Sequence, residues 1–102
     1  MALASIDPSS GEVLESFAET APAALESSLA RAWQVFPGWR ARSFAERGAH
    51  LREAARLLRA HKVDYARLMA REMGKPVTQG EGEVEKCAWC CEYYAEHASA
   101  KA

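Results

Sequence analysis

The sequence lacks an excess of either charge. Its 13 Lys and Arg residues nearly balance 14 Asp and Glu residues, so the formal net charge is -1 and the pI is about 6.3. Nucleic-acid-binding proteins usually carry a basic excess or a basic patch. The arginines here are mostly spread singly along helical patterns, which is typical of solvated faces. We therefore expect no nucleic acid partner.

Long apolar runs are also missing. No stretch approaches the roughly 20 apolar residues of a membrane-spanning helix, and the opening MALASIDPSSGEV lacks the basic start and apolar core of a secretory signal. The 3 cysteines are an odd number and lie close together, which suits a reducing compartment better than a disulfide framework. These absences predict a cytoplasmic protein without a membrane partner.

The composition that remains is ordinary for a globular chain. Of 102 residues, 49% are hydrophobic and 26% are charged, so we expect one domain. Residues 1–19 differ from the rest, because LASI and EVLESF are extended candidates and DPSSG between them has turn chemistry. We predict a β-hairpin over residues 3–18. An isolated hairpin is marginally stable in water, so this one must lean on other elements.

Residues 20–102 follow helical periods. The first helix is expected to begin at Thr20 as N-cap, with Pro22 in its first turn, and to stop at Pro37-Gly38. Its apolar face consists of Leu25, Leu29, Ala32, Trp33 and Phe36.

A capping box of Ser43 and Glu46 opens the next helical region. Its apolar stripe consists of Leu51, Ala54, Ala55 and Leu58. Near His61 and Lys62 the period resets, which leaves open whether the region is one kinked helix or two. The second stripe consists of Tyr65, Leu68, Met69 and Met73. Gly74, with Pro76 after it, ends the region.

A second capping box, Thr78 with Glu81, opens a last helix that runs to the C-terminus. Its apolar stripe consists of Val84, Cys87, Ala88, Cys91, Ala95 and Ala98. The predicted fold class is therefore mainly α: an N-terminal β-hairpin followed by three or four helices.

The three cysteines, Cys87, Cys90 and Cys91, lie inside this last helix. Helical side chains three or four apart have Cβ atoms about 5–6 Å apart, whereas a disulfide needs about 3.5–4.5 Å. A structural zinc site needs four ligands, and His97 lies about 15 Å along the helix from Cys87. Because buried cysteine behaves as a small hydrophobe, we interpret all three as packing residues.

No other group of residues forms a complete site. Glu81, Glu83 and Glu85 splay around the helix axis and suit a helix N-terminus. The histidines, His50, His61 and His97, are separated and have no nucleophile partner, and no phosphate-binding glycine loop is present. We predict no catalytic, cofactor-binding or metal-binding residues in this chain.

Apolar surface is in excess of what a small helical domain can cover. On the last helix, Trp89 and Tyr93 lie on a different side from Val84, and a helix that is apolar on two sides is usually sandwiched. We expect a partner surface, formed by a second copy or by the rest of a longer chain.

The order of motifs resembles the N-terminal segment of aldehyde dehydrogenases, most closely the succinate-semialdehyde dehydrogenase branch. The matching stretches are IDPSSGEVLESF, ARAWQVFPGWRARSFAERGAHLREAARLL and REMGKPVTQGEGEVEKCAWCCEYYAEHA. The resemblance implies that residues 1–102 are part of an α/β aldehyde-dehydrogenase fold, with a hairpin (1–19) and helices (20–102). It also implies that the cofactor-binding and catalytic domains lie downstream.

For a complete enzyme, the resemblance implies oxidation of an aldehyde, such as succinate semialdehyde, to the carboxylic acid with NAD or NADP. The family's cysteine nucleophile, oxyanion donors and water-activating glutamate all lie downstream, so none of the three cysteines here takes that role. Some members hold a monovalent cation near the acidic position that Glu83 matches, but its other ligands are missing here.

We therefore expect a truncated segment that binds no cofactor and is inactive alone. Two alternatives stay open: a freestanding helical protein-interaction module without catalysis, and a small metal or redox protein built on the cysteines.

Overall fold

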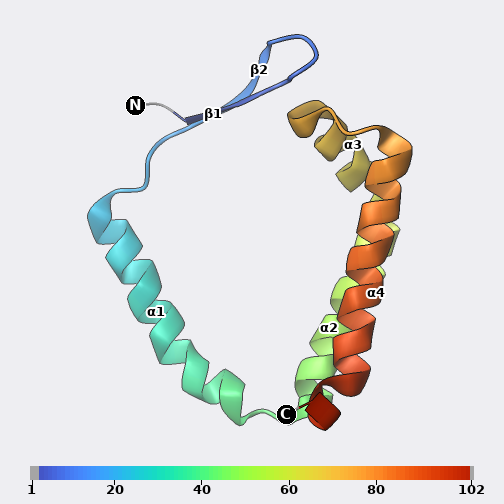
Figure 1. Cartoon of the computed structure of the whole chain (residues 1–102). Helices are drawn as coiled ribbons and strands as arrows, with labels where there is room; N and C mark the ends of the chain where they lie inside the picture. Colours follow the sequence, from blue (N-terminus) through green and yellow to red (C-terminus); the bar gives the residue numbers. More distant parts are fainter. Residues whose placement is uncertain (1–2, 102) are drawn as a thin grey trace.

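The computed structural model describes residues 3–101. The elements in chain order are β1 (Leu3–Ile6), β2 (Val13–Phe17), α1 (Pro22–Ala41), α2 (Phe44–Ala60), α3 (Lys62–Met73) and α4 (Val77–Lys101). Helices α2 and α4 lie side by side, α1 stands apart on the opposite side of an open arc, and the hairpin lies near α3 (Figure 1). The arc measures 47 × 40 × 20 Å. This arrangement confirms the mainly helical fold class with an N-terminal hairpin.

The hairpin forms where the alternating residues and turn chemistry predicted it. Its strands are antiparallel, with Leu3 opposite Phe17. In the turn, the Gly11 N–H donates to the Asp7 carbonyl at 2.8 Å, and Gly11 has a φ of 80°, which a glycine adopts without steric cost. The Ser9 hydroxyl and N–H donate to the Asp7 carboxylate and lower its pKa.

Helix α1 differs from its prediction at both ends. Its N-cap is Ala21, without a side-chain hydrogen bond, so the prediction of Thr20 as the cap is wrong. The predicted stop at Pro37-Gly38 is also wrong, because α1 continues through Pro37 to Ala41. An interior proline removes one hydrogen bond of the helix, at a cost of about 3 kcal/mol, but its φ remains compatible with a helix. Such a residue disfavours the helix and does not forbid it.

The start of α2 and the end of α3 lie at the residues that the sequence signals indicate. The Ser43 hydroxyl accepts a hydrogen bond from the Glu46 N–H at 3.1 Å, which confirms Ser43 as the cap of α2. His61 has a φ of -109° and separates α2 from α3, so the region is two helices. Gly74, with a φ of 71°, ends α3 as predicted.

The start of α4 lies earlier than predicted. Helix α4 begins at Val77, and the Pro76 carbonyl accepts from the Gly80 N–H at 3.0 Å. Thr78 is therefore already inside the first turn, and the prediction of Thr78 as a cap is wrong. Pro76 explains the difference, because its fixed φ is compatible with a helix start.

Small residues form the core between α2, α3 and α4. The described apolar side chains that are buried, each at most 2% exposed, are Ala55, Ala66, Val84 and Ala88. A Cβ added at Gly48 would lie 3.0 Å from the Ala95 carbonyl oxygen, and one at Gly80 would lie 3.1 Å from the Ala66 Cα. The helices therefore approach one another to backbone contact along a small-residue seam.

Residues of the predicted apolar stripes are buried only where they lie at this small-residue seam. The α2 stripe is confirmed, because all four of its residues are buried or half-buried. The α3 stripe is mostly wrong: Tyr65, Leu68 and Met73 are 39%, 48% and 80% exposed, while Ala66 is fully buried. The close approach of α3 to α4 at Gly80 leaves room only for a small side chain, so α3 turns Ala66 toward α4.

Candidate functional site

The cysteine cluster lies on α4 beside the small-residue seam. Cys87 and Cys90 are exposed, Cys91 is half-buried, and all three are free thiols. The interpretation of all three as packing residues is therefore wrong for Cys87 and Cys90. The seam follows Val84 and Ala88, and Cys87 lies about 60° around the helix from Val84, off the contact with α2 and α3.

The structure gathers no metal-ligating constellation from the part of the chain that it describes: no group of three or more His, Cys, Asp or Glu side chains converges there. The histidines have separate surroundings. His50 Nε2 lies 3.3 Å from an Arg42 nitrogen, and the His50 ring packs on Trp39 with centroids 5.4 Å apart. His61 lies 3.9 Å from Asp64. The His97 ring packs on Tyr93 with centroids 4.6 Å apart, so each histidine has a neighbour of its own.

The three glutamates near the start of α4 also point to different partners. The Lys75 ammonium donates to Glu83 at 2.6 Å and lowers the pKa of that carboxyl. Glu85 turns toward α2, while Glu81 is half-buried and forms no ion pair within residues 3–101. The carboxylate that the family resemblance linked to a cation is therefore engaged by a lysine side chain.

Arg59 links α2 to α4 through a cluster that we call the Arg59 clamp. Its Nε donates to Glu85 at 2.7 Å, and its two terminal nitrogens donate to the two oxygens of Glu92 at 2.7 and 2.8 Å. Lys62 adds a second cation 3.6 Å from Glu85. Hydrogen bonds from Arg59 lower the pKa values of both glutamates. The sequence analysis missed this clamp, because its members are 26 and 33 residues apart.

Helix α1 carries an uncovered apolar surface. None of its residues is buried, and Trp33 is 78% exposed. The exposed large apolar residues, which we call the α1 apolar face, are Leu25, Leu29, Trp33, Val35, Phe36 and Trp39. Contiguous apolar surface of this kind marks an interaction site.

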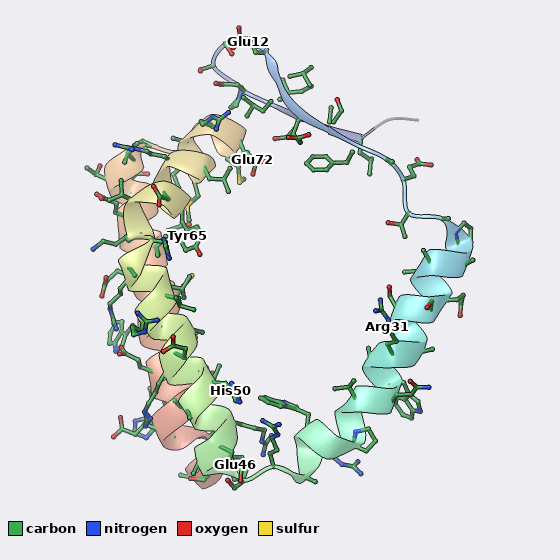
Figure 2. All side chains as sticks on the ribbon, turned by 180° about the vertical axis from the view of Figure 1, so that it is seen from behind. Glu12, Arg31, Glu46, His50, Tyr65 and Glu72 are labelled. Carbon is green, nitrogen blue, oxygen red and sulfur yellow. The ribbon has the colours of Figure 1, made fainter. Side chains whose placement is uncertain are left out.

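The hairpin joins this helix to the rest of the arc. The Ser5 hydroxyl donates to the Glu72 carboxylate at 2.7 Å, and Glu72 lies at the end of α3 that faces the hairpin (Figure 2). Leu14, Phe17 and Leu68 line the hollow between the hairpin and α3. Helix α1 is thus anchored to α3 through the hairpin at one end.

At its other end, α1 leads directly into α2, where Trp39 contacts His50. No helix in residues 3–101 is long and apolar enough to cross a bilayer.

Comparison with known proteins places this arrangement in a family. The sequence profile described as "Aldehyde dehydrogenase family" matches residues 1–102. The chain belongs to the aldehyde dehydrogenase family. This aldehyde dehydrogenase chain is 38% identical to a probable succinate-semialdehyde dehydrogenase (NADP+) of Synechocystis sp., over 96% of its own length and 22% of that protein.

Other relatives give the same coverage. A succinate semialdehyde dehydrogenase (NAD(P)+) of Escherichia coli is 38% identical over 94% of this chain and 21% of its own length. The structure resembles that of succinic semialdehyde dehydrogenase from Streptococcus pyogenes in complex with NADP+, with a TM-score of 0.89 and 36% identity over 95% of this chain and 22% of that one. The chain therefore spans about a fifth of the length of these relatives and forms part of their larger fold.

Proposed function

We propose that this chain is the N-terminal structural segment of an NAD(P)-dependent aldehyde dehydrogenase and is inactive by itself. The parent reaction is the oxidation of an aldehyde, such as succinate semialdehyde, to the carboxylic acid in the cytoplasm. The uncovered α1 apolar face carries the proposal, because a helix with this much exposed apolar surface needs a covering partner. The partner is the remaining part of the aldehyde dehydrogenase fold.

The described residues do not fit a dinucleotide cofactor. Such a cofactor binds beyond the carboxyl ends of parallel strands, with its pyrophosphate at a helix N-terminus that follows a glycine-rich turn. The sheet in residues 3–101 is a two-stranded antiparallel hairpin, and α4 begins after Pro76. We assign no cofactor-binding or catalytic residue to this chain, and no step of the reaction passes through its side chains.

The test is complementation of a split enzyme. The chain is produced together with a homologous succinate-semialdehyde dehydrogenase that lacks its matching N-terminal segment. We expect a stable complex that reduces NADP in the presence of succinate semialdehyde, whereas the purified 102-residue chain does not. Trp33→Glu should abolish the complex because it places a charge in the α1 apolar face. Ser27→Glu, which changes the opposite side of α1, is the matched control and should preserve the complex.

Aldehyde oxidation by the purified chain alone would refute the assignment as an inactive segment. Failure of every tested remainder to bind the chain would refute the packing role. The alternative, a freestanding interaction module, predicts a sharp thermal transition and a defined oligomer without the remainder. The described core holds only four fully buried apolar side chains, which predicts that the chain folds with low stability when the remainder is absent.

A further inference from the structure

Two hollows meet at the corner where α1 leads into α2, and the end of α4 lies beside this corner (Figure 1). The first hollow, of about 460 Å³, is lined by Ala32, Val35, Phe36, Trp39, Arg40 and Arg47. The second, of about 250 Å³, lies between α2 and α4, and Trp39 and Arg47 line it as well. We call the two hollows together the Arg47 socket.

Arg47 carries a hydrogen-bond donor that has no acceptor. Its Nε is buried, and within residues 3–101 it forms neither a hydrogen bond nor a salt bridge. The guanidinium lies over the Phe44 ring, 4.7 Å from the ring centroid. The N–H bonds of a guanidinium lie in its plane, so a ring that covers the face of that plane leaves them unpaired. Because a buried donor without an acceptor is destabilising, native structures usually supply one.

The charges around the Arg47 socket all have one sign. Arg40 and Arg47 line it, and the guanidinium of Arg42 lies over the Trp39 ring at 5.5 Å. No Asp or Glu lines either hollow. Glu46, the nearest carboxylate in the sequence, forms no ion pair within residues 3–101. A mostly apolar surface with cations and no anion is complementary to an apolar side chain that lies next to a carboxylate.

We propose, on the basis of the proposed function, that the Arg47 socket receives a carboxylate from the remainder of the enzyme and that Arg47 anchors it. The carboxylate accepts the Nε–H and one terminal N–H of Arg47 in parallel, which is the geometry of strong arginine–carboxylate pairs. An apolar side chain beside it packs on Phe36 and Trp39. The α1 apolar face supplies buried area, whereas this directional pair fixes the orientation of the remainder on α2.

The matched control is an arginine that already has its anion within the chain. Arg56 lies nine residues after Arg47, on the opposite side of α2, and donates to Glu53 at 2.6 Å. Arg47→Met and Arg56→Met therefore remove the same charge from the same helix. In the complex with the truncated homologous enzyme, Arg47→Met should weaken binding by about tenfold or more. Arg56→Met should change it by no more than about twofold. Isothermal titration calorimetry measures both.

Two further measurements separate an ion pair with the remainder from packing within the chain. Wild-type binding should weaken more steeply with added salt than binding of Arg47→Met, because the variant lacks the pair. Arg47→Lys should bind with intermediate affinity, since lysine keeps the charge but not the planar pair of donors. In the isolated chain the Nε has no acceptor, and methionine can replace the contact with Phe44. Arg47→Met should therefore not lower the urea midpoint of the isolated chain.

Three results would overturn the anchoring role of Arg47. They are wild-type affinity in Arg47→Met, the same salt dependence in wild type and Arg47→Met, and a loss of urea midpoint in the isolated chain as large as the loss in the complex. A complex that is abolished by Trp33→Glu but unaffected by Arg47→Met would refute the anchor and leave the proposed function intact. Absence of any wild-type complex would refute both.

Discussion

Two glycines of α4, two residues apart, provide a direct test of the small-residue seam. Gly82 has open space around it, whereas a Cβ at Gly80 would lie 3.1 Å from both the Cα and the Cβ of Ala66. In a helix interior, alanine is favoured over glycine by about 1 kcal/mol. Gly82→Ala should therefore raise the free energy of unfolding by up to about 1 kcal/mol.

Gly80→Ala gains the same helix propensity but overfills the contact with α3. Overpacking typically costs about 1–3 kcal/mol, so the net change should be a loss of about 0–2 kcal/mol. The difference between the two variants should be about 1–3 kcal/mol. Urea unfolding followed by circular dichroism measures it. Equal stabilisation by both alanines would mean that α3 and α4 do not approach to backbone contact, and would refute the seam.

Three further predictions concern the cap, the thiols and the Arg59 clamp. Ser43→Ala should lower the free energy of unfolding by about 1 kcal/mol because it removes the α2 cap, whereas Thr78→Ala, inside α4, should have a smaller effect; thermal unfolding compares the two. In the folded chain, Cys87 and Cys90 should react with a thiol reagent faster than Cys91, and slow labelling of all three, located by mass spectrometry, would contradict their exposure. The clamp lowers the folded pKa values of Glu85 and Glu92 below the ordinary value of 4.5, so its stabilisation should be complete above that pH and be lost as the pH falls through the lowered values. Arg59→Gln should flatten this acid-side decline in the urea midpoint, and an unchanged pH profile would exclude the clamp as its source.

Turn and capping residues predicted most of the helices and strands correctly, because each of these residues acts on the backbone within a few positions of itself. The hairpin follows from its turn residues, the start of α2 from Ser43, and the end of α3 from Gly74. The same reasoning failed at Pro37 and Thr78. A proline only disfavours a helix that flanking residues support, and a capping pattern has no effect where Pro76 has already started the helix.

Tertiary features were less accessible from the sequence. A helical period identifies apolar positions but does not tell which of them contacts another helix. Tyr65 was therefore expected to pack where Ala66 does, and Cys87 was expected to pack together with Ala88, which alone of the two is buried. The buried positions are those where small side chains let two helices approach closely. They are not the positions with the most hydrophobic side chains. The excess of apolar surface was predicted from the sequence, and Trp89 and Tyr93 are indeed exposed. The Arg59 clamp was missed because its residues meet only after α2 and α4 pair.

The hydrogen bond between Ser5 and Glu72 joins two residues that are 67 positions apart. It therefore closes a loop of the polypeptide that contains α1. A helix that is held at both ends samples far fewer positions than a helix attached at one end. The conformational entropy of closing the loop around α1 is therefore already lost before a partner binds. Its capture by a partner then costs less conformational freedom, and its local concentration at the docking position is high. Removal of the hairpin should therefore weaken binding of the remainder even though no hairpin residue belongs to the α1 apolar face.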